Sequence, residues 1–154
     1  MKKVKKKGIW FYGLSGSGKT YASKVILKEN KNSFLIDGDD VRKFLSQDLN
    51  YSLQDRKIQI RRIFGIARIA LKSNLFPIIS TVYMDKHIAK NLRKNKIHLV
   101  KIIRDLKKIM KTHKTYKNKR NVVGKDIRLD QIKSTNIFNS GDKIFCKEIL
   151  KLTK

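Results

Sequence analysis

A short segment near the N-terminus has the residue types that bind the phosphates of a nucleotide. Its residues are Gly13, Leu14, Ser15, Gly16, Ser17, Gly18, Lys19 and Thr20, which fit the pattern G-x-x-x-x-G-K-S/T. Glycines let the backbone curl so that successive N–H groups face an anion. The lysine of this pattern reaches the β- and γ-phosphates, and the final hydroxyl coordinates Mg²⁺. We therefore expect a nucleoside triphosphate site, with Lys19 in catalysis and Thr20 as a metal ligand.

Carboxylates follow the apolar run Ser33–Ile36, where a second strand is expected to end. At the edge of a sheet, one of Asp37 and Asp39 can orient the metal while the other accepts the proton of an attacking hydroxyl. The alternative is that Asp-Gly makes a turn and that Asp39 or Asp40 caps the next helix. The third apolar run ends in Ser80–Thr81 and brings no acid to this edge.

Other features narrow the class of nucleotide-binding protein. A GTPase needs a guanine-reading Asn-Lys-x-Asp, and the nearest segment, Asn118–Asn121, lacks the aspartate. Motor and helicase ATPases need a longer chain than 154 residues. The length suits a small-molecule kinase that uses ATP as its phosphate donor. A metabolite kinase of the shikimate or gluconate type shares the phosphate loop but leaves Val41–Arg42 and Tyr51–Arg56 without a role.

The elements that must position these residues alternate between short apolar runs and helical patterns. The strands expected are Gly8–Tyr12, Ser33–Ile36, Phe76–Ser80, Ile97–Ile103 and, weakly, Ile137–Phe138. The helices expected are Lys19–Glu29, Val41–Leu49, Leu53–Ser73, Lys86–Lys94 and Lys143–Leu152. This alternation predicts an α/β, P-loop kinase fold with a parallel sheet between two layers of helices. The length predicts one domain over residues 1–154.

Charge is the most prominent feature of the composition, with 38 Lys+Arg against 12 Asp+Glu and a net charge of +26. Such an excess suits nucleic acid, anionic membranes or small polyanions, or it reflects a lysine-rich composition without a binding role. Aromatic residues make up 8% of the chain, and no strand combines aromatic and basic residues for base stacking. We therefore expect small nucleotides as partners, with no nucleic acid and no membrane. A basic nucleic-acid-binding module with a phosphate loop is the weaker alternative.

The remaining chemistry-bearing residues predict no further site. Met1–Lys7 is basic, but the apolar stretch after it is too short for a signal peptide, so we expect a soluble, cytoplasmic protein. The single cysteine, Cys146, allows no internal disulfide and is expected to pack in the fold. The histidines lack metal-ligand spacing and are read as structural; they are His87, His98 and His113.

The segment Lys101–Lys125 is dense in lysine and arginine and contains one acid, Asp105. Its apolar periodicity is weak. It is either a solvated surface element or a mobile lid that closes over phosphates.

Three segments together resemble the adenylyl-sulfate kinase family. They are Gly13–Thr20, then Leu35–Arg62 (LIDGDDVRKFLSQDLNYSLQDRKIQIRR), and more weakly Arg104–Asp105 with Asn121–Ile127. The first is shared by many kinases. The second is specific, because Asp-Gly-Asp-x-Val-Arg followed by Tyr-Ser-x-x-Asp-Arg is not general to P-loop proteins. The third looks like that family's lid, and the resemblance covers nearly the whole chain.

The resemblance implies transfer of a phosphoryl group from ATP to the ribose 3′-hydroxyl of adenylyl sulfate, with Mg²⁺ as cofactor. It implies an acceptor site formed by Asp39, Arg42, Tyr51, Arg56, Gln59 and Ser80. It also implies a lid that includes Arg104, Asp105, Arg120 and Gly124. Asp39 would be the base, Tyr51 would stack on the acceptor's base, and Arg56 would pair with its phosphosulfate. The alternatives are a surface arginine at Arg42, core packing for Tyr51, and an ion pair of Arg56 with Asp55 or Asp48.

The chain departs from the family pattern at two places. Ser80–Asp85 lacks the family's proline and arginine after strand three, and Arg104–Met110 lacks the glycine and tyrosine of its lid. Some relatives phosphorylate other nucleotide conjugates in surface-polysaccharide pathways. A conjugate such as a cytidine diphosphate derivative is therefore the alternative acceptor. Members of the family often form dimers, so a homodimer is a further expectation.

Overall fold

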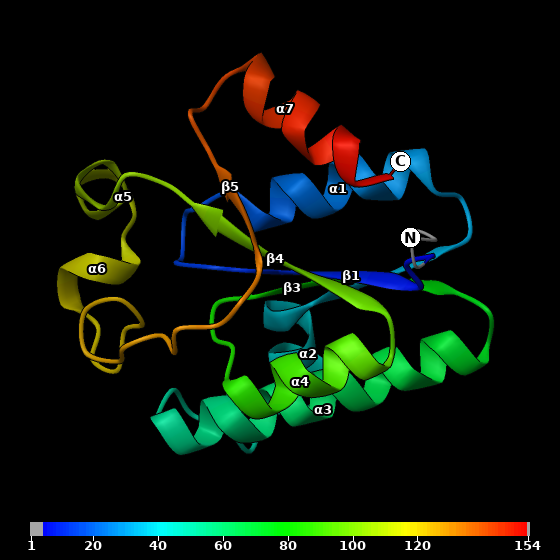
Figure 1. The fold of residues 1–154 in the computed structure, drawn as a ribbon. Coiled ribbons are helices and arrows are strands. Elements are labelled where there is room, and N and C mark those ends of the chain that lie inside the picture. The colour runs from blue at the N-terminus through cyan, green and yellow to red at the C-terminus, as the bar shows by residue number, and fades with distance from the viewer. Residues whose placement is uncertain (1–4, 154) are drawn as a thin grey trace.

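A parallel five-stranded sheet runs through the middle of the protein (Figure 1). A computed structural model describes residues 5–153, without the side chains of residues 112 and 118; the expected basic run Met1–Lys7 lies partly outside them. The strands are β1 (Gly8–Tyr12), β2 (Ser33–Asp37), β3 (Phe76–Thr81), β4 (Ile97–Ile103) and β5 (Thr135–Phe138). Their order is β2-β3-β1-β4-β5, and every pairing is parallel.

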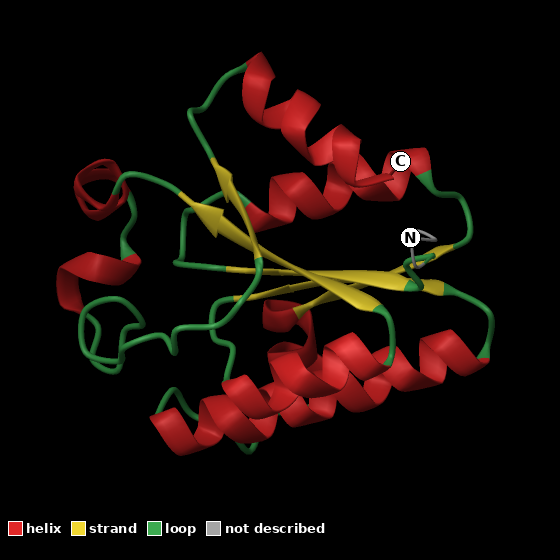
Figure 2. Cartoon of the chain, in the orientation of Figure 1, coloured by secondary structure: helices red, strands yellow, loops and turns green. Residues whose placement is uncertain are grey.

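Helices cover both faces of this sheet (Figure 2). α1 (Lys19–Glu29) and α7 (Lys143–Leu150) pack on one face, and a 3₁₀ turn, Lys151–Thr153, follows α7. α3 (Leu53–Lys72) and α4 (Lys86–Lys94) pack on the other face. This arrangement confirms the predicted three-layer α/β/α class.

The central strand β1 is buried along its whole length because both faces of the sheet are covered. Its side chains alternate between two apolar clusters. Trp10 packs with Ile63 of α3 and Leu92 of α4, whereas Phe11 packs with Ile26 of α1. The apolar run in the sequence, with no polar alternation, is therefore what a strand covered on both faces requires.

The helix after β2 differs from its prediction at both ends. α2 spans Gly38–Phe44 instead of Val41–Leu49. It begins early because the Asp37 carboxylate accepts a hydrogen bond from the Asp39 N–H at 2.9 Å and caps the helix, so the cap is neither Asp39 nor Asp40. The expected strands Ser33–Ile36, Phe76–Ser80 and Ile137–Phe138 are each one or two residues longer in the structure.

The carboxyl ends of all five strands meet at one edge of the sheet, where two short helices of the expected lid segment also lie (Figure 1). These helices, α5 (Leu106–Thr112) and α6 (Thr115–Asn118), belong to the segment between β4 and β5. In parallel α/β sheets ligands bind at this edge. The fold thus brings five loops that are distant in sequence to one place.

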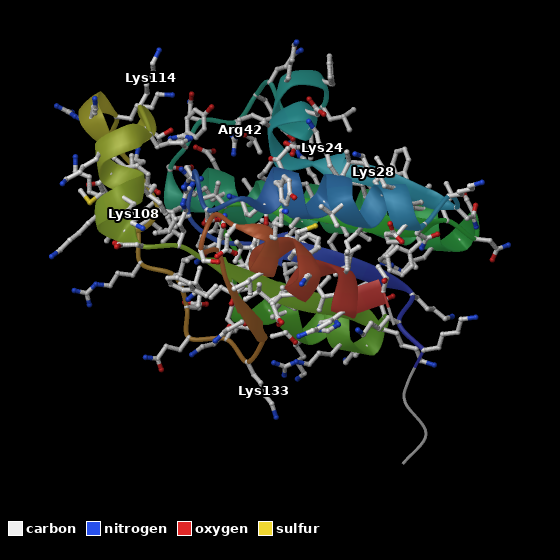
Figure 3. All side chains as sticks on the ribbon, turned by 90° about the horizontal axis from the view of Figure 1, so that it is seen from above. Lys24, Lys28, Arg42, Lys108, Lys114 and Lys133 are labelled. Carbon is white, nitrogen blue, oxygen red and sulfur yellow. The ribbon has the colours of Figure 1, made fainter. Side chains whose placement is uncertain are left out.

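The basic side chains are spread over the surface (Figure 3). The labelled lysines lie on separate elements: Lys24 and Lys28 on α1, Lys114 in the lid, and Lys133 before β5. Over residues 5–153, no helix is both long enough and apolar enough to span a bilayer.

Candidate active site

The phosphate loop curls between β1 and the start of α1, as its sequence predicts. The Ser17 N–H donates to the Leu14 carbonyl at 3.1 Å, which closes the turn. Gly18 is the N-cap of α1 and has a φ of 106°, in the left-handed region where a side chain is strained. The loop therefore places backbone N–H groups and the positive end of α1 around one point, an arrangement suited to phosphate.

Lys19 is almost fully buried beside this loop. Its Nζ donates to the Leu14 carbonyl at 2.9 Å. Burial lowers its pKa to about 8, against a smaller opposing effect from the carboxylates of Asp39 and Asp37. A nearby polyphosphate would stabilise the protonated form of Lys19 and raise its pKa again.

A small network fixes the carboxylates at the ends of β2 and β3. Asp37 accepts from the Ser80 hydroxyl at 2.7 Å through Oδ2 and from the Asp39 N–H at 2.9 Å through Oδ1. Asp37 is therefore held in place as a cap and acceptor, while the Asp39 side chain is exposed at the cavity. This geometry favours Asp39 over Asp37 for any contact with a reacting hydroxyl. Ser80 lines the cavity as well as donating to Asp37, and its expected contact with the acceptor stays a prediction.

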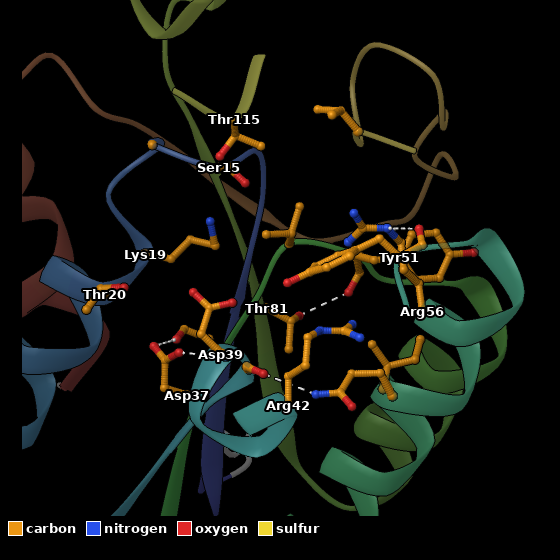
Figure 4. Close-up of a pocket in the computed structure, with 18 of the residues that line it drawn as sticks. Ser15, Lys19, Thr20, Asp37, Asp39, Arg42, Tyr51, Arg56, Thr81 and Thr115 are labelled. Atoms are coloured by element: carbon orange, nitrogen blue, oxygen red, sulfur yellow. Dashed lines mark hydrogen bonds between the residues drawn. The ribbon is translucent and has the colours of Figure 1, made fainter. Parts of the chain in front are cut away.

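The predicted magnesium site has oxygen donors on two sides of the cavity. The Thr20 hydroxyl lies at the start of α1, and Asp37 and Asp39 lie across the same cavity (Figure 4). A hydroxyl, carboxylates and phosphate oxygens are the hard oxygen ligands that Mg²⁺ prefers. The residues present therefore fit the metal.

Two arginines and a tyrosine form a second cluster, across the cavity from Lys19 (Figure 4). The guanidinium groups of Arg42 and Arg56 lie 4.6 and 5.5 Å from the centre of the Tyr51 ring. Arg42 donates to the Asn50 carbonyl at 2.6 Å, and this contact holds the loop that follows α2. Tyr51 is 50% exposed, so it is not a core residue.

Arg56 has no carboxylate partner of the kind that the sequence left open. The carboxylate of Asp48 pairs with Arg62 at 2.6 Å, and that of Asp55 accepts from the Ser52 hydroxyl at 2.7 Å. Arg56 donates instead to backbone carbonyls, of Tyr51 at 3.1 Å and of Asn121 at 2.9 Å. Burial and the neighbouring Arg42 charge lower its pKa. An anion in the cavity would relieve this repulsion.

Gln59 lies on α3 beneath the cluster and is 5% exposed. Its side-chain amide donates to the Gly38 carbonyl at 3.1 Å and so ties α3 to the start of α2. Its amide oxygen is buried and has no hydrogen-bond partner among the described residues. Gln59 thus lines the part of the cavity next to the arginine cluster and ties two of its elements together.

The phosphate loop and the arginine cluster line one cavity of about 760 Å³, a size typical of ligand sites. The residues that line it come from several segments between β1 and residue 122. Among them are Lys19, Thr20, Asp39, Arg42, Arg56 and Arg120. The cavity therefore joins a phosphate site to a second, strongly cationic site.

The lid packs directly on the phosphate loop. Tyr116 donates its hydroxyl to the Ser15 carbonyl at 3.3 Å, and Arg104 donates to the Gly16 carbonyl at 3.2 Å. Gly124 lies against Leu14, because a Cβ at Gly124 would fall 2.6 Å from a methyl carbon of Leu14. Parts of Lys101–Lys125 therefore pack on the phosphate loop, and the closure of this segment over phosphates stays a prediction.

Other lid residues have simpler roles. The Asp105 carboxylate accepts from the Lys107 N–H at 2.8 Å and caps α5. His113 lines the cavity, and a Cβ at Gly16 would fall 2.8 Å from its ring. Among residues 5–153, no three His, Cys, Asp or Glu side chains are grouped closely enough to hold a metal ion by themselves.

A second cavity of about 550 Å³ opens on the other side of the phosphate loop. Its lining includes Arg104, Tyr21, Phe145 and Asn139, and Tyr21 stacks on Phe145 with 5.8 Å between ring centres. Cys146 also lines it and is half-buried, so it is only partly the packing residue that the sequence suggested. A cationic guanidinium and aromatic rings around a slot suit a planar base.

Sequence reasoning missed Asn139 altogether. The residue follows β5 at the same edge of the sheet, and its side chain donates to the Ser17 carbonyl at 2.7 Å. The available signal was its position: the residue after a parallel strand lies at the ligand edge. The expected fifth strand was too weak in sequence to draw attention to it.

A parallel sheet in this order, with a phosphate loop after β1, defines the class of P-loop kinase folds. Solved structures agree. An APS kinase of Mycobacterium tuberculosis in complex with AMPPNP and APS has a TM-score of 0.82, with 18% identity, and 96% of this chain matches 95% of that one. A sugar kinase from Janibacter has a TM-score of 0.67 with 12% identity over 96% of this chain and 94% of that one. At such identities the likeness shows the fold alone.

The sequence comparisons then give the family. The adenylylsulphate kinase profile matches residues 5–130, and the chain belongs to this family. It is similar to the adenylyl-sulfate kinase of Pseudomonas aeruginosa, with 45% identity over 78 residues. It is also similar to that of Buchnera aphidicola from Acyrthosiphon pisum, with 38% identity over 91 residues. The matches cover 48% and 53% of this chain but only 40% and 44% of those relatives.

Proposed function

We propose that the protein is a kinase that transfers the γ-phosphoryl group of ATP to the ribose 3′-hydroxyl of adenylyl sulfate. The product is 3′-phosphoadenylyl sulfate, the activated sulfate of sulfate assimilation. One observation supports this most strongly: a single cavity joins the phosphate loop to the cluster of Arg42, Tyr51 and Arg56. A donor polyphosphate and an anionic acceptor nucleotide can therefore meet in it.

The donor would lie across the phosphate loop between the two cavities. Its phosphates would accept from the loop N–H groups and from Lys19. Its base would enter the second cavity, between Arg104 and the rings of Tyr21 and Phe145. Thr20 and the Asp37 carboxylate would hold Mg²⁺, which when bound offsets phosphate charge.

The acceptor would lie over Tyr51, with its charged group toward Arg42 and Arg56. Guanidinium forks match phosphate and sulfate oxygens and keep their charge at any working pH. Both guanidinium groups lie within 5.5 Å of the centre of the Tyr51 ring, so a base that stacks on this ring would lie close to them. Arg120 of the lid lines the same cavity and would add a further cation.

The transfer step needs little from the protein beyond position and charge. The 3′-oxygen forms a bond to the γ-phosphorus, and the bond from that phosphorus to the β,γ-bridging oxygen breaks, so that ADP leaves. The hydroxyl proton passes to the exposed carboxylate of Asp39. Lys19 and the lid cations offset the charge on the group in transfer.

The acceptor alternative has a specific observation in its favour. The cavity wall at the end of β3 is formed by Thr81, Val82 and Tyr83, none of which is cationic. This wall lacks the arginine of the family pattern, so the acceptor's headgroup can differ from that of adenylyl sulfate, as it does in a cytidine diphosphate derivative. Measuring which of the two acceptors stimulates ADP release distinguishes between them.

The test is ADP release by the purified full chain with ATP and Mg²⁺, against a panel of nucleotide acceptors. We expect adenylyl sulfate to stimulate release, and Lys19→Met to abolish it. Stimulation by a cytidine diphosphate conjugate instead would favour the alternative acceptor. A folded protein that releases no ADP with any of these acceptors would refute the proposal.

A further inference from the structure

Asn139 joins the end of β5 to the phosphate loop, although the two are far apart in sequence. Its side chain is 8% exposed. The Nδ2 group donates to the Ser17 carbonyl at 2.7 Å, and Oδ1 accepts from the Gly141 N–H at 2.9 Å. Its backbone N–H donates to the Ile103 carbonyl at 2.7 Å. Each of these polar groups makes a hydrogen bond, and together the bonds hold the side chain in one orientation.

The partners also determine which way round the amide lies. Ser17 offers a carbonyl, which needs the nitrogen, and Gly141 offers an N–H, which needs the oxygen. A flipped amide would lose both bonds. The donor is therefore assigned to the phosphate-loop side by the hydrogen-bond network itself.

The contact with Ser17 fixes a peptide plane in the phosphate loop. In a trans peptide the carbonyl of one residue and the N–H of the next point in opposite directions. The chain has no cis peptide among its described residues. With the Ser17 carbonyl held toward Asn139, the N–H of Gly18 must point away from Asn139, into the concave side of the loop.

Gly18 is shaped by the same contact. A Cβ on Gly18 would lie 2.4 Å from the Asn139 nitrogen, closer than any real contact allows. The glycine at this position is thus required by the approach of Asn139 as well as by its own φ of 106°. Asn139 and Gly18 therefore depend on each other: the Asn139 amide fixes the plane of the Ser17–Gly18 peptide, and the missing side chain of Gly18 leaves space for that amide.

We propose that Asn139 is a positioning residue for the phosphates of the donor: it acts through the Ser17–Gly18 peptide, whose N–H it aims at them. This inference rests on the proposed ATP site but not on the identity of the acceptor. Asn139 also lines the second cavity. A direct contact with the donor's base is therefore the competing role, and it predicts a different result.

The experiment compares Mg²⁺–ATP with inorganic tripolyphosphate, which has no base, by calorimetric titration of the full chain. For Asn139→Ala we expect the affinity for both probes to fall by the same factor, about tenfold, because a buried hydrogen bond to the loop is lost. Ser140→Ala is the matched control. It removes a hydroxyl one residue further on, which donates to Asp142 and not to the loop, and it should bind both probes as the unaltered protein does.

Three results would overturn the inference. One is unchanged tripolyphosphate affinity in a folded Asn139→Ala protein, whether or not ATP affinity falls. The second is an equal loss in Ser140→Ala, and the third is a different factor of loss for the two probes. A measurement on the unaltered chain covers the case in which the variant does not fold. The Gly18 amide proton resonance should shift strongly when tripolyphosphate is added, and an unmoved resonance would refute the proposal. If the unaltered protein binds neither probe, the proposed ATP site fails as well.

Discussion

Replacing Arg56 with alanine tests the division of the cavity into two sites. Arg56 lies on the proposed acceptor side, 5.5 Å from the Tyr51 ring centre, and its side-chain hydrogen bonds go to the carbonyls of Tyr51 and Asn121. None of these contacts reaches the phosphate loop. The substitution should therefore weaken use of the acceptor and leave ATP binding nearly intact.

The size of the effect follows from the charge that is removed. A hydrogen bond to a charged group contributes about 1.5–3 kcal/mol, and each 1.4 kcal/mol is a factor of about ten. Loss of one such bond to the acceptor's anion predicts a rise of about 10- to 150-fold in the acceptor KM. Arg56→Lys should recover only part of this, because an ammonium cannot form the planar fork. ATP affinity should stay within about twofold, since the substitution makes no change at the phosphate loop.

The assay is steady-state ADP release at varied acceptor, together with direct titration of ATP. Arg62→Ala is the matched control on the same helix. It breaks an exposed pair with Asp48 and should leave the acceptor KM unchanged. If Arg56→Ala weakens ATP binding while acceptor use survives, the assignment of the two sites is wrong. If Arg62→Ala raises the acceptor KM as much, the effect is general to α3.

Three further predictions concern the phosphate loop, the base and the lid. Burial lowers the pKa of Lys19 to about 8 in the free protein, and bound phosphate should raise it again. ATP binding should then take up protons near pH 8 and weaken as the pH rises above that value. Calorimetry in buffers of different ionisation enthalpy measures the uptake, and its persistence in Lys19→Met would contradict the assignment. Asp39→Asn should lower kcat by about 10²- to 10⁴-fold with little change in ATP affinity; a loss below about tenfold would point to another base. Gly124→Ala should destabilise the protein by about 1–2 kcal/mol, because φ is 89° and the new methyl group meets Leu14. Gly65→Ala, with open space around its Cβ, is the thermal-unfolding control, and an equal fall in Tm in both variants would refute the lid contact.

The elements were predictable from sequence where local and tertiary preferences agree. The strand Gly8–Tyr12 and the helices Lys19–Glu29 and Lys86–Lys94 have the predicted bounds. Continuous apolar runs suit strands covered on both faces, and the phosphate-loop pattern encodes its own backbone shape. The helix after β2 was misplaced because its cap depends on which nearby aspartate accepts the backbone N–H. That choice follows from the hydrogen bond that Ser80, distant in sequence, makes to Asp37.

Site residues were predictable where a motif carries them. Asp39, Arg42, Tyr51, Arg56 and Gln59 all line the cavity that the phosphate loop enters. Their spacing in one segment, from the end of β2 to the middle of α3, is what keeps them together. Their chemical roles stay predictions until the variants above are measured.

Sequence by itself determined the class of protein, because a phosphate loop between a strand and a helix is a local structure with local causes. Tertiary structure decided the partners. It paired Asp48 with Arg62 and left Arg56 to carbonyls and the cavity. It also brought Asn139 to the Ser17 carbonyl. A lone asparagine after a short strand has no pattern of its own. Only the packing of β5 beside β4 places it against the loop, and contacts between distant segments depend on the whole fold.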